Sequence, residues 1–332
     1  FMLKLPTVAQ MKTQILNGTN FGPCWGMSGV QNFFGEGWPH HKLMKALGIL
    51  DFTGMTFVAK TTTIDRRIGN MPLGKNLMPT EFIPKCIDVD FWNARVLNAV
   101  SLSGPGLRAL LDTGKWQARI EPFFISFMSV AGTRDERLAE TREFVDILRP
   151  RIKEFAGMFG VQKNDSCPNT GHGKPDVSEI LEGLDIMKPL HNAGIAIALK
   201  LGVDTPPEVA MELETHPSLD AICVSNTIPF GKMGLPWDKW YPNGSPLVPY
   251  LGEKFQGGLS GAPLHHIVTD WVKVARARGF VKPINAGGGI LCPDDVDNLM
   301  KAGADSVSLG SIAILRPWRV HRTIKRSWDY IT

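Results

Sequence analysis

The strongest constraint on the fold is an apolar strand that recurs eight times, with helical stretches between the copies. The eight strands span residues 22–28, 54–60, 122–129, 158–165, 194–200, 220–226, 282–287 and 305–310. Strands that are apolar throughout are buried on both faces, which is typical of a parallel sheet covered by helices. Eight such units predict a (β/α)8 or TIM barrel. We therefore predict one α/β domain over residues 1–332, with an N-terminal extension before the first strand.

The composition is that of a globular protein with a sizeable core, because 43% of the 332 residues are hydrophobic and 20% are charged. The net charge of +4 is small, and basic residues do not cluster with aromatic ones, so we expect no nucleic-acid partner. The five cysteines are far apart and form no CxxC pair, so no metal or iron–sulfur site is indicated. Sparse cysteines and the lack of a run of about 20 apolar residues predict a cytoplasmic protein without a membrane partner.

A long segment after the sixth predicted strand, residues 228–256, is rich in proline, glycine and aromatic residues. Loops of this length inside a domain are either functional or disordered. Its aromatic residues favour an ordered, packed insertion that acts as an active-site lid: Trp237, Trp240, Tyr241 and Tyr250.

Polar residues follow the apolar strands at their carboxyl ends, where barrels carry their chemistry. Lys60 and Lys200 each end an apolar strand. A lysine there is costly unless it meets an anion or polar ligand, although one that reaches solvent at the rim is the alternative. The last two strands run into Gly288-Gly289 and Gly310-Ser311, where barrels often bind a phosphate through bared backbone amides.

The most informative stretch follows the fourth strand and reads Asn164-Asp165-Ser166-Cys167-Pro168-Asn169. Pro168 removes a backbone donor and biases Cys167 toward an extended conformation, which places the thiol on a rigid loop. A lone cysteine is more often a small buried hydrophobe, but the flanking carboxamides favour a site. This run resembles the active-site loop of the dihydroorotate dehydrogenases, specifically of the cytosolic class 1 enzymes that use cysteine. The resemblance extends from about Ser28 to Ile314.

The resemblance implies an FMN-dependent oxidoreductase that converts dihydroorotate to orotate in pyrimidine biosynthesis. It implies that Cys167 takes a proton from C5 of the substrate while a hydride leaves C6 for flavin N5. Lys200 would stabilise the negative charge that gathers near flavin N1, and Lys60 would fix the flavin and the approach of the substrate. These three residues are the implied catalytic set.

The family positions also imply two binding sets. Substrate-binding residues would be Asn98, Ser101, Leu102, Asn164, Asn169, Asn226 and Thr227, since carboxamides both donate to carbonyls and accept from ring N–H groups. FMN would be bound by Met27, Ser28, Gly29, Lys60, Thr61, Asn164, Lys200, Val224, Gly261, Gly288, Gly289, Gly310 and Ser311.

One departure from the family pattern affects the substrate. Ser101 stands where relatives usually have glycine, and Ser103-Gly104 stand where they have Pro-Asn. If the loop needs a positive φ at Ser101, the pocket for the substrate carboxylate is altered; if it does not, the serine hydroxyl adds a donor. One alternative is therefore the same flavin barrel acting on another dihydropyrimidine or an enoate-like compound. The other is a barrel that binds flavin or a phosphosugar without turnover.

The electron acceptor and the assembly are left open by the sequence. No NAD fingerprint is present, so a soluble acceptor such as fumarate or a separate partner chain would take the electrons. Relatives are commonly dimers, which implies a homodimer.

Overall fold

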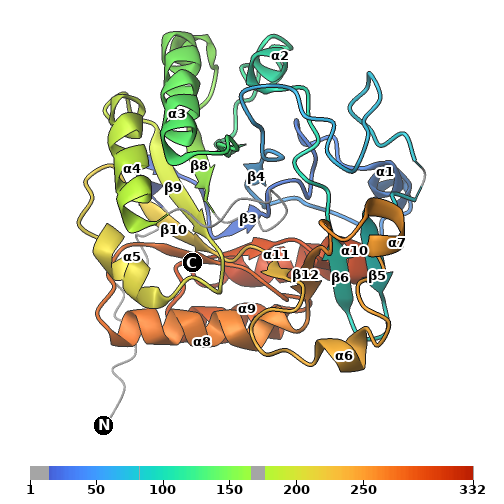
Figure 1. The fold of residues 1–332 in the computed structure, drawn as a ribbon. Helices are drawn as coiled ribbons and strands as arrows, with labels where there is room; N and C mark the ends of the chain where they lie inside the picture. Colours follow the sequence, from blue (N-terminus) through green and yellow to red (C-terminus); the bar gives the residue numbers. More distant parts are fainter. Residues whose placement is uncertain (1–14, 82, 166–175, 332) are drawn as a thin grey trace.

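The computed structural model describes residues 15–81, 83–165 and 176–331 of the chain. Eight parallel strands form one sheet in the order β3-β14-β13-β10-β9-β8-β7-β4 (Figure 1). Backbone hydrogen bonds between the segments of β3 and β4 close this sheet into a barrel, from Gly26 N to Thr56 O (2.9 Å) and from Thr56 N to Cys24 O (2.8 Å). The predicted (β/α)8 barrel is confirmed. Its strands are β3 (Cys24–Gly26), β4 (Phe57–Val58), β7 (Phe123–Phe127), β8 (Phe159–Asn164), β9 (Ala196–Leu201), β10 (Ala221–Val224), β13 (Ile284–Ala286) and β14 (Ser306–Leu309).

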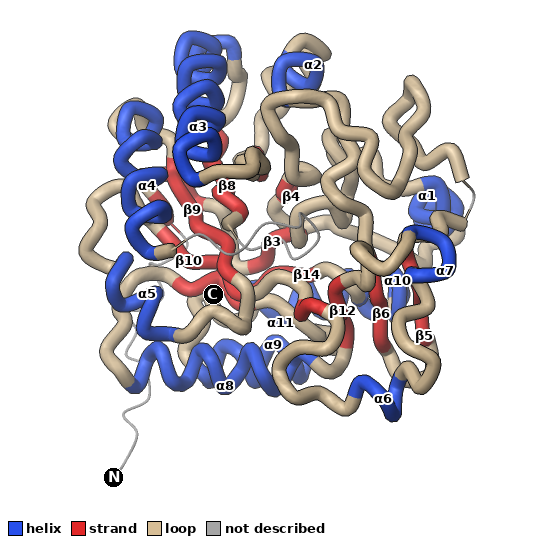
Figure 2. Tube along the Cα trace, in the orientation of Figure 1, coloured by secondary structure: helices blue, strands red, loops and turns tan. Residues whose placement is uncertain are grey.

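Helices connect the strands and cover the outside of the barrel (Figure 2). The main ones are α3 (Arg134–Leu148), α4 (Val177–His191), α5 (Pro207–Leu213) and α8 (Leu264–Ala277), and each packs against the next. Within the described ranges, no helix has the length and apolar character that a membrane crossing requires. The remaining helices and turns are α1 (Pro39–Ala46), α2 (Leu107–Leu111), α6 (Trp237–Trp240), α7 (Val248–Leu251), α9 (Pro293–Ala302), α10 (Ile312–Leu315), α11 (Val320–Trp328) and the 3₁₀ turns η2 (Arg149–Glu154) and η4 (Pro317–Arg319). The N-terminal extension contributes a hairpin of β1 (Ile15–Leu16) and β2 (Thr19–Asn20).

Large apolar side chains fill one half of the barrel interior. The ring of Phe124 stacks on Phe21 at 4.2 Å between centroids and lies 4.6 Å from the ring of Trp25. Gly160 on β8 makes room for Phe124, because a Cβ at Gly160 would lie 2.5 Å from the Phe124 ring. Leu16 from the N-terminal hairpin joins the same cluster. This half is therefore a packed core, and the polar residues of the interior lie toward the carboxyl ends of the strands.

A second, antiparallel sheet lies beside the barrel and is built from two insertions (Figure 1). The connection after β4 supplies β5 (Ile87–Asp90) and β6 (Arg95–Asn98), and the connection after β10 supplies β11 (Ile228–Pro229) and β12 (Gly258–Gly261). β12 pairs with β6, so that Gly258 lies opposite Asn98. The pairing holds the two insertions together although they are far apart in the sequence.

The insertion at 228–256 is packed through most of its aromatic residues, as predicted. The ring centroid of Trp237 lies 6.0 Å from that of Trp240 and 6.3 Å from that of Tyr241. Tyr250 is different, because it lies on α7 with 64% of its surface exposed. The expectation that Tyr250 packs in this cluster was wrong, and the lid function of the insertion stays a prediction.

Proline and aspartate set two helix boundaries beside the site. α3 ends as α-helix at Leu148 and continues as a 3₁₀ turn, because Pro150 lacks a backbone donor and clashes with the preceding turn. Asp176 caps α4: its carboxylate accepts a hydrogen bond from the backbone N–H three residues later at 2.7 Å.

Candidate active site

A cavity of about 690 Å³ lies at the carboxyl ends of the barrel strands. Its size is within the range of small-molecule sites. Polar residues from several strands meet in it, including Lys60 after β4, Asn164 at the end of β8 and Lys200 near the end of β9. The barrel thus brings together residues that are separated by up to 140 positions, because its parallel strands all end at one face.

Most of the site residues predicted from the sequence line this cavity. Cys167 and Asn169 lie outside the described residues. Val224 and Gly261 are described but do not line it: Val224 is fully buried, and its neighbour Ser225 faces the cavity instead, since successive strand residues point to opposite sides. The predicted residues in the lining are Met27, Ser28, Gly29, Lys60, Thr61, Asn98, Ser101, Leu102, Asn164, Lys200, Asn226, Thr227, Gly288, Gly289, Gly310 and Ser311.

Hydrogen bonds connect the polar side chains on the floor of the cavity. Asn226 Nδ2 donates to Asn164 Oδ1 at 3.0 Å. Lys200 Nζ donates to Ser28 Oγ at 3.3 Å, and Ser28 Oγ lies 3.2 Å from Thr61 Oγ1. Side chains from five strands or strand ends are therefore held in fixed positions relative to one another before any ligand binds.

The floor of the cavity is positively charged. Lys60 and Lys200 are only 6% and 5% exposed, respectively. Lys60 Nζ donates to the carbonyl oxygen of Ser103 and lies 5.1 Å from the centroid of the Phe33 ring. Glu81 is the one acidic side chain among the described residues that line the cavity. Because buried ammonium groups need compensating charge or hydrogen bonds, this floor fits an anionic ligand.

The glycines after β13 allow a close approach between two backbone segments. Gly289 has φ +69°, and a Cβ there would lie 2.6 Å from the carbonyl oxygen of Gly261 and 2.8 Å from the amide nitrogen of His265. A Cβ at Gly288 would lie 2.9 Å from the side chain of Val268. Glycine is therefore required at both positions, and both line the cavity beside Gly310 of the neighbouring strand end. Backbone N–H groups that are left accessible at these glycines can bind a phosphate.

The turn after β6 settles the two alternatives for Ser101. Ser101 has φ +58° and Leu102 has φ +60°, so both adopt the left-handed conformation that glycine reaches easily. The Ser101 hydroxyl accepts a hydrogen bond from Asn70 Nδ2 at 3.1 Å, and Asn70 Nδ2 also donates to Ala99 O at 2.8 Å. The turn does need a positive φ at Ser101, and the hydroxyl holds the turn to the 70-loop. Asn70 therefore supports this turn.

Sequence reasoning missed the outer wall of the cavity. This wall is largely apolar and comes from α1, residues 79–81 and 83–87, and α10. Such residues carry no motif, and they meet at one cavity only in the folded chain. The lining residues that were not predicted are Val30, Trp38, Pro39, His40, His41, Leu43, Met71, Pro79, Glu81, Ile83, Pro84, Ile87, Val96, Val100, Ser225, Ser260, Leu264, Ile290, Ser308, Ala313 and Ile314.

The four cysteines in the described part of the chain are free and poorly suited to form thiolates. Burial raises the pKa of Cys24 and of Cys223 to about 12 and that of Cys86 to about 11. Burial also raises the pKa of Cys292. A thiol acts as a base or nucleophile only as the thiolate, so these four stay protonated and inert at neutral pH. No group of three potential metal ligands occurs among the described residues.

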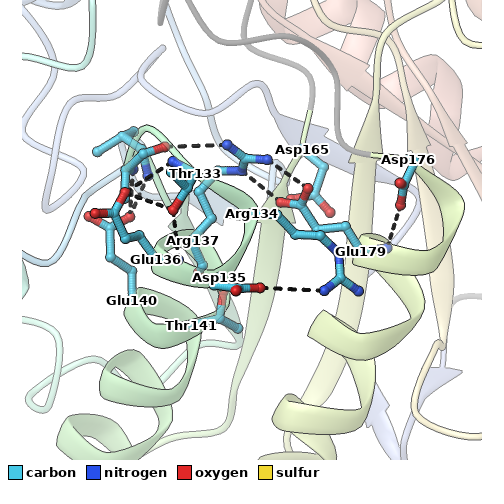
Figure 3. A network of polar contacts seen from close by, with 12 residues as sticks. Thr133, Arg134, Asp135, Glu136, Arg137, Glu140, Thr141, Asp165, Asp176 and Glu179 are labelled. Atoms are coloured by element: carbon cyan, nitrogen blue, oxygen red, sulfur yellow. Dashed lines mark hydrogen bonds and ion pairs between the residues drawn. The ribbon is translucent and has the colours of Figure 1, made fainter.

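Charged residues gather at the end of β8 and at the start of α4 (Figure 3). On one side, Lys163 and Asp165 form an ion pair in which each side chain is 5% exposed. On the other side, Asp176 caps α4. Arg137 of α3 forms a bidentate salt bridge with Glu179 of α4, with Nε–Oε1 and Nη2–Oε2 distances of 2.7 Å. The end of β8 and the start of α4 are thus fixed by buried polar contacts.

Comparison with known proteins identifies the family. A profile of the family described as dihydroorotate dehydrogenase matches residues 40–329. The chain is 25% identical over 271 residues to the dihydroorotate dehydrogenase B (NAD(+)) catalytic subunit of Bacillus pumilus, which covers 79% of this chain and 75% of that protein. The protein of the same description from Listeria welshimeri is 25% identical over 272 residues, covering 79% and 76%.

The fold has a match among solved structures as well. DHODH of Eimeria tenella in complex with ferulenol superposes with a TM-score of 0.63 and 18% sequence identity, covering 96% of this chain and 83% of that one. The chain belongs to the dihydroorotate dehydrogenase family. It is an enzyme, an oxidoreductase that acts on CH–CH bonds, and the family resemblance inferred from the cysteine loop is confirmed.

Proposed function

We propose that the protein oxidises dihydroorotate to orotate with bound FMN, as a step of pyrimidine biosynthesis. The observation that carries the proposal is the set of lysines and carboxamides gathered on the cavity floor, in a chain of this family. These residues are Lys60, Asn98, Asn164, Lys200 and Asn226. A homodimer and a cytoplasmic location stay predictions.

The residues that line the cavity fit FMN. The glycines at 288 and 289 cannot carry a Cβ, and with Gly310 and Ser311 they would hold the phosphate. Lys200, beside Ser28, would place its ammonium against the negative charge of the reduced ring. When bound, FMN supplies the acceptor for the hydride that leaves the substrate. The Lys60 and Lys200 charges also favour the dianionic phosphate and an anionic substrate over neutral ligands.

The same floor fits a flat ring with alternating carbonyl and N–H groups. Asn164 and Asn226 share a hydrogen bond at 3.0 Å, which fixes the orientation of both carboxamides. Asn98 lies on β6 of the second sheet, opposite Gly258 of β12. Amides of the left-handed turn at 101–102 would bind the substrate carboxylate, assisted by the charge of Lys60. Cys167, which lies outside the described residues, would take the proton from C5. The raised pKa values of the four described cysteines leave it as the candidate base.

Anaerobic mixing of the FMN-loaded protein with dihydroorotate tests the proposal. We expect the flavin absorbance to bleach, because electrons have passed to FMN. Cys167→Ala should keep the flavin and lose about 10²–10⁴-fold in the rate of reduction, the usual contribution of a general base. Cys292→Ala is the matched control and should leave that rate unchanged, since its thiol is protonated and bonded to Asp295. A Cys167→Ala protein that reduces its flavin at the wild-type rate would show that the base is another group.

The altered turn at Ser101 supports one competing function, which is the same flavin barrel acting on another dihydropyrimidine or an enoate-like compound. Protein with intact FMN that millimolar dihydroorotate does not bleach would favour this alternative. The electron acceptor can be identified by following reoxidation of the reduced protein with fumarate and with NAD(+). NAD(+) is chosen because it is part of the name of the Bacillus pumilus relative.

A further inference from the structure

Ser126 on β7 is a buried hydroxyl that neither a sequence motif nor the family resemblance singles out. Its exposed fraction is 0%, and it does not belong to the lining of the cavity. Its Oγ lies 2.9 Å from Thr61 Oγ1, just below the cavity floor. Thr61 is the one side-chain partner of the Ser126 hydroxyl in the described part of the chain, so the direction of this hydrogen bond can be worked out.

Counting donors and acceptors fixes the direction. A buried hydroxyl hydrogen without an acceptor is destabilising, so Ser126 donates to Thr61. Each hydroxyl has one hydrogen and two acceptor sites. Thr61 Oγ1 accepts from Ser126 and, at 3.5 Å, from Asn164 Nδ2. Its own hydrogen is therefore directed to Ser28 Oγ, 3.2 Å away.

The same count continues at Ser28. Its oxygen accepts from Thr61 and from Lys200 Nζ, the latter at 3.3 Å. Both acceptor sites of Ser28 are then used, and Ser28 lines the cavity. Its remaining hydrogen points into the cavity, next to the ammonium of Lys200.

We propose that Ser126 is a positioning residue that sets the direction of the hydroxyl chain from Ser126 through Thr61 to Ser28, and so makes Ser28 a hydrogen-bond donor into the cavity. The inference rests on the proposed function, because it takes FMN as the ligand beside Lys200. A donor to an ionised acceptor forms a hydrogen bond about twice as strong as one to a neutral acceptor. The hydroxyl chain therefore favours the more negatively charged, reduced form of FMN over the oxidised form.

The test is a redox titration of FMN bound to the full-length protein, with a chemical reductant and no substrate. We expect Ser126→Ala to lower the two-electron midpoint potential by about 30 mV, which is about a tenfold weaker preference for reduced over oxidised FMN. Ser28→Ala should lower it at least as much. The double variant should match Ser28→Ala alone, because without Ser28 there is no donor left to orient.

Thr62→Val is the matched control. Thr62 is also buried, but among the described residues its hydroxyl bonds only to the neighbouring carbonyl of Thr63, at 3.1 Å, so the midpoint potential should stay at the wild-type value. If Ser126→Ala fails to fold, Thr61→Val takes its place, and its effect must again vanish in the Ser28→Ala background.

An unchanged potential in Ser126→Ala, or additive effects of Ser126→Ala and Ser28→Ala, would overturn the inference. Wild-type protein that is reduced by dihydroorotate in a separate anaerobic mixing experiment would then leave the proposed function standing. Protein that binds no FMN would overturn both.

Discussion

Replacing Ser101 with glycine tests the left-handed turn at the edge of the cavity. A non-glycine residue in this conformation costs about 1–2 kcal/mol, and glycine removes that cost. Glycine also adds about 0.5–1 kcal/mol of conformational entropy to the unfolded chain. The variant loses the hydroxyl that accepts from Asn70 at 3.1 Å, which contributes about 1 kcal/mol. These effects nearly cancel, so we expect Ser101→Gly to change the free energy of unfolding by less than about 1 kcal/mol.

Ser101→Ala separates the hydroxyl from the backbone. It removes the same hydrogen bond but keeps a Cβ at φ +58°, so nothing offsets the loss of about 1 kcal/mol. Urea unfolding should therefore rank the wild type above Ser101→Ala, with Ser101→Gly about 0.5–1 kcal/mol more stable than Ser101→Ala. An alanine variant more stable than the glycine variant would refute the argument, because it would mean that residue 101 is not left-handed.

The same pair of variants reports on the substrate. Glycine leaves the backbone amides of the turn less well ordered. About 0.5–1 kcal/mol of added conformational entropy corresponds to about two- to fivefold weaker binding of dihydroorotate. Anaerobic stopped-flow measurements should show this as a higher dissociation constant for dihydroorotate in Ser101→Gly, with the same reduction rate at saturation. A lower saturated rate with unchanged affinity would place Ser101 in the chemistry and contradict its assignment to carboxylate binding.

Three further perturbations follow from the structure. Arg137→Met should lower the free energy of unfolding by about 3 kcal/mol, because it leaves Glu179 buried without its partner. Arg134→Met breaks an ion pair with Glu182 in which both side chains are 40% exposed, so it should lower the free energy of unfolding by less than about 1 kcal/mol. Urea unfolding measures both variants, and an equal loss of stability in the two would contradict the role of burial. Burial is the main cause that lowers the pKa of His41 from 6.5 to about 3, and the charges of His40 and Lys45 lower it further. Between pH 6.5 and pH 3 the imidazole is therefore protonated only in the unfolded state. Stability conferred by a neutral His41 is complete above pH 6.5 and falls by about 1.4 kcal/mol per pH unit toward pH 3, and His41→Gln should show a correspondingly flatter pH dependence of its urea midpoint. Gly289→Ala should weaken FMN binding at least about tenfold, measured by flavin fluorescence, since its Cβ would lie 2.6 Å from Gly261 O and its φ is positive.

The barrel could be predicted because each of its strands carries its own signal. A strand buried on both faces must be apolar throughout, and the helices between strands have their own periodicity. The second sheet had no such signal. Its strands are two to four residues long, and β6 pairs with β12 across some 160 positions. Pairing of that kind depends on where the barrel places the two insertions, so no local pattern reveals it.

The floor of the site was predictable for a related reason, and its supports were not. Lys60, Asn164 and Lys200 interrupt apolar strands, so each is conspicuous in the sequence. Ser126 meets the hydroxyl of Thr61, and Asn70 meets the hydroxyl of Ser101 and the carbonyl of Ala99. Serine and asparagine are common in strands' ends and loops for many reasons, and only the folded chain shows which hydroxyl or carboxamide they meet.

The strand β8 shows how one element can serve the site on both of its faces. Asn164 points into the barrel, where Asn226 holds it. Its neighbour Lys163 points outward to α4, where Gly183 leaves room for it, since a Cβ there would lie 3.0 Å from Lys163 Cε. Lys163 pairs with Asp165. Arg137 pairs with Glu179 at the start of α4 (Figure 3).

A buried ion pair rarely stabilises a protein more than an apolar pair of the same volume would. Its requirement for one geometry, however, fixes the position of Asp165 directly after the strand. The register of β8 therefore decides that the carboxamide of Asn164 faces the cavity while Lys163 faces α4. Lys163→Met with Asp165→Leu should then be nearly neutral or stabilising in urea, while the rate of flavin reduction by dihydroorotate falls. A double variant with wild-type reduction kinetics would show that the pair serves stability alone.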